Sequence, residues 1–118
     1  MLIFKIFRRS EWNDLTSAGE TLGAPVDVAD GFIHFSTAAQ VAETAARHFA
    51  TESDLVLVAV DADALGAALK WEPSRGGALF PHLYRRLSQT DVVWDKSLPL
   101  GASGHIFPEA HLFAGQQK

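Results

Sequence analysis

The sequence predicts a single compact α+β domain, with two main helices in the N-terminal half and mostly strands after them. The chain has 118 residues, which is enough for one domain with its own core and too few for two. Segments with helical periodicity fall before residue 50, whereas short apolar runs typical of strands continue almost to the end. We therefore expect one domain over residues 1–114 and a frayed tail at 115–118.

The first segments alternate between strand and helix. The aromatic-rich run 2–7 predicts a strand, because apolar and β-branched residues dominate it. Ser10 is expected to cap a helix over residues 11–19, which Gly19 ends. Residues 23–30 contain a proline and a glycine between the two regular segments, so we predict a loop there.

The stretch DGFIHFST predicts a strand that leads into a second helix. The strand covers residues 31–35, and its apolar side chains alternate with polar ones. Thr37 and Gln40 have the spacing of a capping box, with the threonine as N-cap. We expect the helix to run from there to about Ala50, with a buried face on which residues recur every three or four positions: Val41, Ala45, His48 and Phe49.

Strands dominate the second half of the sequence. Residues 54–61 form an uninterrupted apolar run that is typical of a central strand, and the segment around Gly66 predicts a helical turn. Because Pro81 cannot donate a ladder hydrogen bond, residues 80–87 are expected to form an edge strand or a loop. Further strands are predicted at 69–72, 91–98 and 104–107.

Composition narrows the function classes. The chain lacks cysteine, so neither a disulfide framework nor a cysteine zinc site is possible, and a reducing compartment fits. We see neither a signal peptide nor an apolar run long enough to cross a membrane, and we therefore predict a cytoplasmic protein without a membrane partner. A net charge of −4 argues against a general nucleic-acid binder.

Two segments place an imidazole and a hydroxyl on one face of an extended chain. In the first, His34 and Ser36 are two residues apart; in the second, FPHLYR, His82 and Tyr84 repeat that spacing. Satisfied core histidines and a helix cap would explain each segment alone. The repetition favours a shared polar cleft lined by both histidines.

Three charged residues extend the candidate site. Glu72 ends a predicted strand, and Arg75 follows in a glycine-rich turn where it could recognise a carboxylate or phosphate. A surface salt bridge between these two is the alternative. Lys5 is either a residue of the cleft or an edge charge that prevents strand-to-strand aggregation.

The histidine pattern favours acid–base or binding chemistry over metal or serine chemistry. The five histidines lack a close pair on a helix face, so we predict no metal site. Neither Ser36 nor Ser74 has the surroundings of a catalytic nucleophile. General acid–base catalysis by His34 or His82 remains open, and so does a role in binding alone.

The segments DGFIHFST, SRGG and FPHLYR resemble a bacterial and plant family numbered 952 among the domains of unknown function, over nearly the whole chain. That family is similar in fold to the ADP-ribosyltransferases, which bind NAD in the cleft of a split, strand-rich α+β domain. The resemblance implies NAD, as a substrate, or an ADP-ribosyl group as the ligand. The sequence departs from the transferase pattern because it has no E-x-E or Q-x-E element.

The resemblance also implies roles for the candidate residues. His34 would orient the ribose, Ser36 and Thr37 would lie at the nicotinamide side, and Lys5 or Arg75 would hold the pyrophosphate. His82 or Glu72 would transfer a proton, which makes His34, His82 and Glu72 the catalytic candidates, and Tyr84 would contact the ligand. The alternative is a non-catalytic module that binds a small anionic metabolite in the same cleft. The sequence predicts no oligomeric state.

Overall fold

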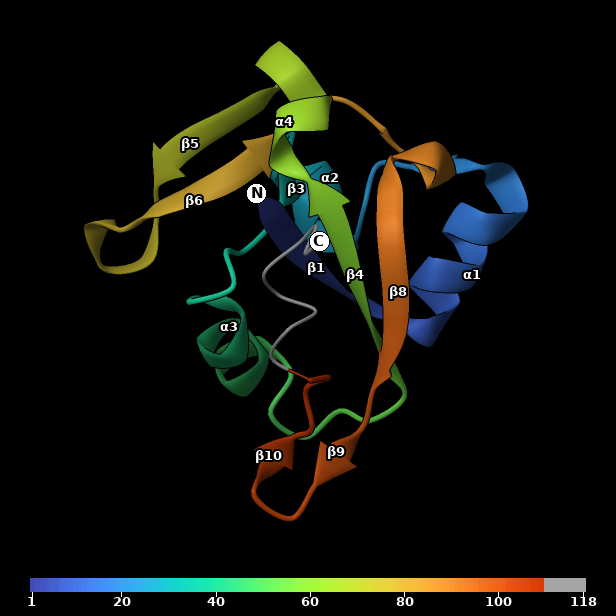
Figure 1. Cartoon of the computed structure of the whole chain (residues 1–118), viewed down its shortest axis with the longest axis vertical. Helices are drawn as coiled ribbons and strands as arrows, with labels where there is room; N and C mark the ends of the chain where they lie inside the picture. The colour runs from blue at the N-terminus through green and yellow to red at the C-terminus, as the bar shows by residue number, and fades with distance from the viewer. Residues whose placement is uncertain (110–118) are drawn as a thin grey trace.

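An antiparallel sheet of three strands forms the centre of the molecule (Figure 1). The computed structural model describes residues 1–109, apart from the side chain of Arg75, and the predicted end of the domain and its tail lie outside that part. The sheet has the order β1-β4-β8, made by β1 (Leu2–Arg8), β4 (Leu55–Asp61) and β8 (Val92–Leu98). The prediction that residues 54–61 form a central strand is confirmed.

A second antiparallel sheet lies beside the first. It contains β3 (Ile33–His34), β6 (Leu79–Leu83) and β5 (Leu69–Pro73), in the order β3-β6-β5. Phe4 of β1 and Ser36 exchange two backbone hydrogen bonds of 2.8 Å, and this bridge connects the sheets. The strand-rich α+β architecture is therefore confirmed.

The place of β6 corrects the prediction for residues 80–87, because β6 is the middle strand of its sheet. The Pro81 carbonyl accepts the Phe35 N–H at 3.0 Å, so it faces the β3 side. The N–H and C=O groups of one antiparallel residue point to the same side. An N–H at position 81 would point to the β3 side, past the end of the short β3. Its absence therefore does not interrupt the backbone hydrogen bonds between β6 and β5.

The described residues contain four α-helices beside the two sheets, and two of the helices begin differently from the predictions. The helix α1 (Arg9–Ala18) begins before Ser10, with Arg8 as N-cap, and ends at Gly19, whose φ is 85°. The helix α3 (Val41–His48) begins four residues after Thr37. Half of the predicted capping box is nevertheless present, because the Thr37 N–H donates to the Gln40 side chain at 3.0 Å. The fourth helix is α4 (Ala62–Leu65), followed by the 3-10 turn η1 (Gly66–Ala68).

The predicted loop at 23–30 is wrong, because most of it forms the helix α2 (Pro25–Asp30). Proline at the first helical position is preset for helix geometry and lacks an N–H that would in any case be unpaired. The Asp27 side chain accepts the Ala24 N–H at 2.7 Å, and Gly31 ends the helix with a φ of 87°. These are ordinary helix signals, and they put a carboxylate into the interior.

Short elements complete the described chain. Two small antiparallel pairs join β2 (Glu20–Thr21) to β7 (Leu87–Ser88) and β9 (Leu100–Gly101) to β10 (Gly104–His105). The 3-10 turns are η2 (Arg75–Gly77) and η3 (Gln89–Asp91). Within the described residues, no helix combines the length and apolar character that crossing a bilayer would take.

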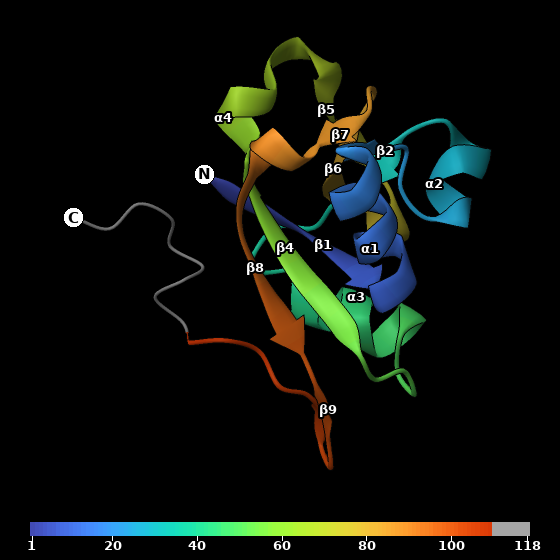
Figure 2. The same cartoon turned by 90° about the vertical axis from the view of Figure 1, so that its right-hand side faces the viewer.

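The first sheet separates two hydrophobic clusters. Side chains alternate between the faces of a strand, so Ile3 and Phe7 join one cluster while Phe4 and Ile6 join the other. The helix α1 covers the first cluster and α3 covers the second, and the two helices lie on opposite sides of the sheet in Figure 1. Figure 2 shows α2 beyond the β2 and β7 pair, outside the central sheet.

Candidate functional site

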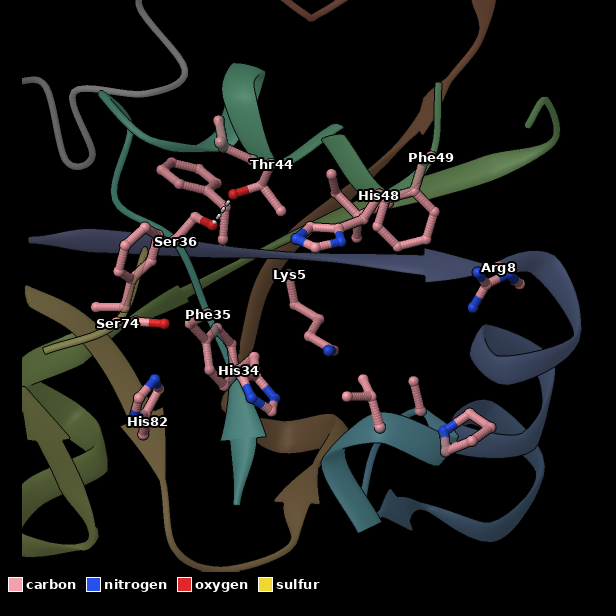
Figure 3. A pocket seen from close by; sticks show the side chains of 17 residues that line it. Lys5, Arg8, His34, Phe35, Ser36, Thr44, His48, Phe49, Ser74 and His82 are labelled. Carbon is pink, nitrogen blue, oxygen red and sulfur yellow. Dashed lines mark hydrogen bonds between the residues drawn. The ribbon is translucent and has the colours of Figure 1, made fainter. Parts of the chain in front are cut away.

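A pocket of about 650 Å³ opens between β1, β3, β6, α2 and α3. Its lining contains no acidic side chain among the described residues, whereas basic side chains come from several elements. The basic residues are Lys5, Arg8, His34, His48 and His82. The candidate cleft of the two histidine segments is therefore present in the structure, and Figure 3 shows both rings facing it.

The pocket also has aromatic walls. Phe4, Phe35, Phe49 and Phe80 line it, together with Val41 and Ile6 and the start of α2. An apolar lining with a few converging polar groups is typical of small-molecule sites.

Lys5 enters the pocket from the middle of β1 (Figure 3). Its side chain is 7% exposed, and Nζ lies 2.7 Å from Oδ2 of Asp27, which is fully buried. An unpaired ammonium at such a depth would be strongly destabilising, so the carboxylate is the reason that Lys5 can remain charged there. Lys5 is almost fully buried and paired, which argues against the alternative of an exposed edge charge that prevents aggregation.

Asp27 binds His34 as well as Lys5. Its Oδ1 accepts the His34 backbone N–H at 3.1 Å and lies 2.6 Å from Nδ1 of the ring. On the other side of the ring, Nε2 lies 3.0 Å from Oδ2 of Asp30. Both contacts with the imidazole are hydrogen bonds at the same time only when the ring has two protons.

The surroundings of Asp27 keep it ionised. Burial acts to raise the pKa of this carboxyl, but the hydrogen bond from His34 and the charge of Lys5 outweigh it. The net result is a pKa below the ordinary value of 3.8. The carboxylate therefore stays charged near neutral pH and holds both basic groups at the pocket wall.

His82 lies opposite His34 in the β3-β6 pair, and the ring centroids are 5.4 Å apart. Its ring is almost fully buried and stacks on Phe32, with 4.2 Å between centroids. Nδ1 lies 2.7 Å from Oε1 of Glu72, and the Tyr84 hydroxyl donates to that same oxygen at 2.7 Å. The two predicted segments therefore form one connected cluster around Phe32.

Glu72 and Tyr84 influence each other through that shared oxygen. The hydrogen bond from His82, and after it the bond from Tyr84, lower the pKa of the Glu72 carboxyl. The bond to Glu72 raises the pKa of the Tyr84 phenol. Neither residue lines the pocket; Glu72 contacts the His82 ring, and Tyr84 contacts Glu72.

The remaining predicted residues have less direct places. Ser36 lines the pocket, but it is buried, and its hydroxyl lies 2.9 Å from that of Thr44. Thr37 does not line the pocket. Arg75 lies in η2, and its side chain is outside the described part of the chain. Its neighbour Ser74 does line the pocket.

Sequence reasoning missed three members of the site. Asp27 was hidden in a predicted loop, although Pro25 before it and Gly31 after it were usable helix signals. His48 was expected on the buried face of its helix, but it is exposed and lines the pocket. Arg8 lines the pocket while its guanidinium binds Glu52 at 2.7 Å, a long-range pair that no local pattern predicts.

No group of three or more histidine, aspartate or glutamate side chains that could hold a metal ion occurs within residues 1–109. Three carboxylates contact the imidazoles instead: Asp27 and Asp30 contact His34, and Glu72, which also accepts from Tyr84, contacts His82. The arrangement can bind an acceptor group through Lys5 and can present imidazole nitrogens to a ligand.

The fold and the pocket together define a class: a small α+β domain whose two sheets hold a basic, aromatic-walled pocket between them. The chain belongs to the family described as "Protein of unknown function (DUF952)", whose model matches residues 6–95. This confirms the family that the histidine motifs indicated. The relation to ADP-ribosyltransferases is not established by the match and stays a prediction.

Solved structures of one relative have the same fold. The chain is 50% identical to protein CC0527 from Caulobacter crescentus, a structural genomics target with a crystal structure, at a TM-score of 0.85. The match covers 89% of this chain and 92% of that one. The solution NMR structure of CC0527 matches with 51% identity and a TM-score of 0.79, over 88% of this chain and 90% of that one. The search of curated proteins found no match.

Proposed function

We propose that the protein binds a small anionic molecule with a flat or apolar part in the pocket between the two sheets. The observation that supports this most is the lining, which contains five basic side chains and no acidic one among the described residues. A pocket of about 650 Å³ is within the range of ordinary ligand sites. The phenylalanine walls suit a planar ring or an apolar chain.

Lys5 is the residue that we assign to the anionic group. Its ammonium has three donors, and within the described residues its hydrogen bond is the one to Asp27. Two donors therefore remain for a ligand carboxylate or phosphate. Because both partners are buried, such a bond would form in a low-dielectric setting where charge-assisted hydrogen bonds are strong.

NAD or an ADP-ribosyl group is the ligand class that we propose to test first. Its pyrophosphate would meet Lys5 or Arg75, and its rings would lie against the aromatic walls. His34 and Ser36 line the same pocket and would contact the ribose and the nicotinamide side. The support for this class is the predicted relation of the family to the ADP-ribosyltransferase fold.

Catalysis on that ligand is the second candidate function. The observation that favours it is the His82 imidazole held by the Glu72 carboxylate at 2.7 Å, since a base oriented by a carboxylate is a recurring catalytic arrangement. Release of nicotinamide from NAD over several hours would support catalysis. Binding without release would leave the module for a small anionic metabolite as the function.

Titration calorimetry with NAD and ADP-ribose tests the binding. We expect saturable binding at millimolar concentration or tighter, and about tenfold weaker binding in Lys5→Met, as for loss of one charge-assisted hydrogen bond. Lys96→Met, an exposed lysine on β8, is the matched control and should bind as the wild type does. Because Lys5→Met leaves Asp27 without a partner, its fold is checked by circular dichroism, and Arg8→Met gives a second pocket variant.

Two binding results would contradict parts of the proposal. If neither NAD nor ADP-ribose binds at millimolar concentration, the nucleotide class is wrong. If a panel of smaller phosphates and carboxylates also fails to bind, the anion site itself is wrong.

A further inference from the structure

The Nε2 atom of His82 is buried and has no hydrogen-bond partner among residues 1–109. The His82 side chain is 5% exposed and lines the pocket, where Figure 3 shows its ring facing the same cavity as His34 and Ser74. Buried polar atoms are nearly always hydrogen-bonded, because an unmade bond costs free energy. The hydrogen-bond partner of Nε2 is therefore expected to belong to a molecule that the pocket binds.

The other ring nitrogen determines what Nε2 can do. An ionised carboxylate only accepts hydrogen bonds, so Nδ1 must be the donor in its 2.7 Å contact with Oε1 of Glu72. Tyr84 donates to that oxygen as well and favours the ionised carboxylate. In neutral His82 the proton is therefore on Nδ1, and Nε2 is an acceptor.

The ring is also fixed in orientation. His82 lies on the middle strand β6, and Phe32 stacks on it at 4.2 Å, with an angle of 26° between the ring planes. In the ladder, Glu72 pairs with Phe80, two residues before His82, and this places the carboxylate diagonally across the strands. Packing and hydrogen bonding thus hold Nδ1 toward Glu72, and Nε2 is directed away from it.

We propose that Tyr84, Glu72 and His82 form a chain of hydrogen bonds, called the relay below, that keeps Nε2 of His82 unprotonated at the pocket wall. The ligand must therefore bring a hydroxyl or N–H donor to this atom. His82 is the specificity-determining residue, and Glu72 and Tyr84 are positioning residues. The inference rests on the proposed function and narrows its ligand class to molecules with an acidic group and a nearby donor. Lys5 and His34 bind the two oxygens of the same Asp27 carboxylate, and the His34 and His82 rings are 5.4 Å apart, so an anionic group at Lys5 and a donor at His82 can belong to one small molecule. A hydroxyl beside a phosphate ester has this pattern.

The first test reads the ring directly by side-chain ¹⁵N NMR at pH 8. The wild type should show His82 protonated on Nδ1 and unprotonated on Nε2. In Glu72→Gln the introduced amide offers a donor as well as an acceptor, so the Nε2–H form should become populated. Asp95→Asn is the matched control: it makes the same kind of carboxylate-to-amide change at an exposed position on β8, so the ring should stay as in the wild type. A proton on Nε2 in the wild type, or an unchanged ring in Glu72→Gln, would overturn the relay.

The second test asks for the ligand donor. Glycerol 3-phosphate and propyl phosphate have similar size and the same acidic group, but only the first has hydroxyls. The wild type should bind glycerol 3-phosphate about tenfold more tightly, since a buried acceptor is satisfied. In His82→Phe, which keeps a ring for Phe32 to stack on, the preference should disappear. Equal binding of the two probes to the wild type would overturn the donor requirement.

The two tests separate this inference from the proposed function. If neither phosphate probe binds, the result counts against the anion site. The protonation of the His82 ring nitrogens, measured by NMR, still shows whether the relay exists. If both probes bind and the wild-type ring has its proton on Nε2, the pocket stands and the relay is wrong.

Discussion

Asp27 connects α2, β1 and β3 through its two carboxylate oxygens. It accepts hydrogen bonds from Ala24, Lys5 and His34, and the two oxygens share these donors between them. A buried charge is tolerated only when it is paired and fully hydrogen-bonded, and Asp27 meets both conditions. The position of two basic pocket residues therefore depends on one carboxylate that does not itself line the pocket.

Replacing Asp27 by asparagine tests this dependence. The Lys5 ammonium would stay buried without a counter-charge, and breaking a buried pair costs about 3–5 kcal/mol in the free energy of unfolding. Urea denaturation followed by circular dichroism measures the loss. Asp95→Asn, at an exposed position on β8, should change stability by less than about 0.5 kcal/mol. Equal effects of the two substitutions would show that the buried pair is energetically unimportant.

The lowered pKa of Asp27 predicts a pH dependence of stability. The folded protein binds this proton more weakly than the unfolded chain does, so the contribution of Asp27 is complete above the ordinary pKa of 3.8. It is lost as the pH falls through the lower folded pKa. The stability difference between wild type and Asp27→Asn should therefore shrink between about pH 5 and pH 2. Denaturation midpoints at a series of pH values measure this, and a constant difference would contradict the account.

The element that brings Asp27 inward is the turn into α2. Gly23 has a φ of 97°, a backbone conformation that favours glycine. A Cβ at this position would lie 2.8 Å from the Cβ of Asp27 and would overlap its carboxylate. The glycine therefore permits both the turn and the close approach of the buried side chain.

Gly23→Ala and Gly19→Ala form a matched pair at the scale of this turn. Both positions have a positive φ, but a Cβ at Gly19 would meet no atom within 4 Å. Gly19→Ala should cost about 1 kcal/mol from backbone strain alone. Gly23→Ala should cost a further 1–3 kcal/mol or so, because the Asp27 carboxylate must move. Thermal or urea unfolding gives both values, and equal losses would argue against close packing at Gly23.

At the scale of the whole molecule, the sequence predicted the regular elements best where the pattern was local. The run from residue 54 to 61 has no polar interruption, so its place in the sheet centre followed directly. The strand β6 was uncertain because the effect of Pro81 depends on which neighbour its missing N–H faces. That direction is a property of the assembled sheet and not of the segment itself.

The candidate site could be predicted only in part for the same reason. The repeated spacing of an imidazole and a hydroxyl identified His34 and His82 as candidate site residues, and the structure places both in one pocket. The carboxylate that holds His34 is seven residues away and was assigned to a loop, so its role did not follow from strand alternation. The pairing of Glu72 with His82 depends on the β5-β6 register, which the sequence did not specify.

The pocket between the two sheets is proposed to bind an anionic, nucleotide-like ligand. The most direct measurement is an NMR titration with ADP-ribose that follows the backbone amides and the His34 and His82 rings. The account predicts saturable shifts at both rings, at Lys5 and along the start of α3, with the exposed outer strand β8 unchanged. Shifts that spread evenly over the surface, or rings that do not respond at millimolar ligand, would contradict it.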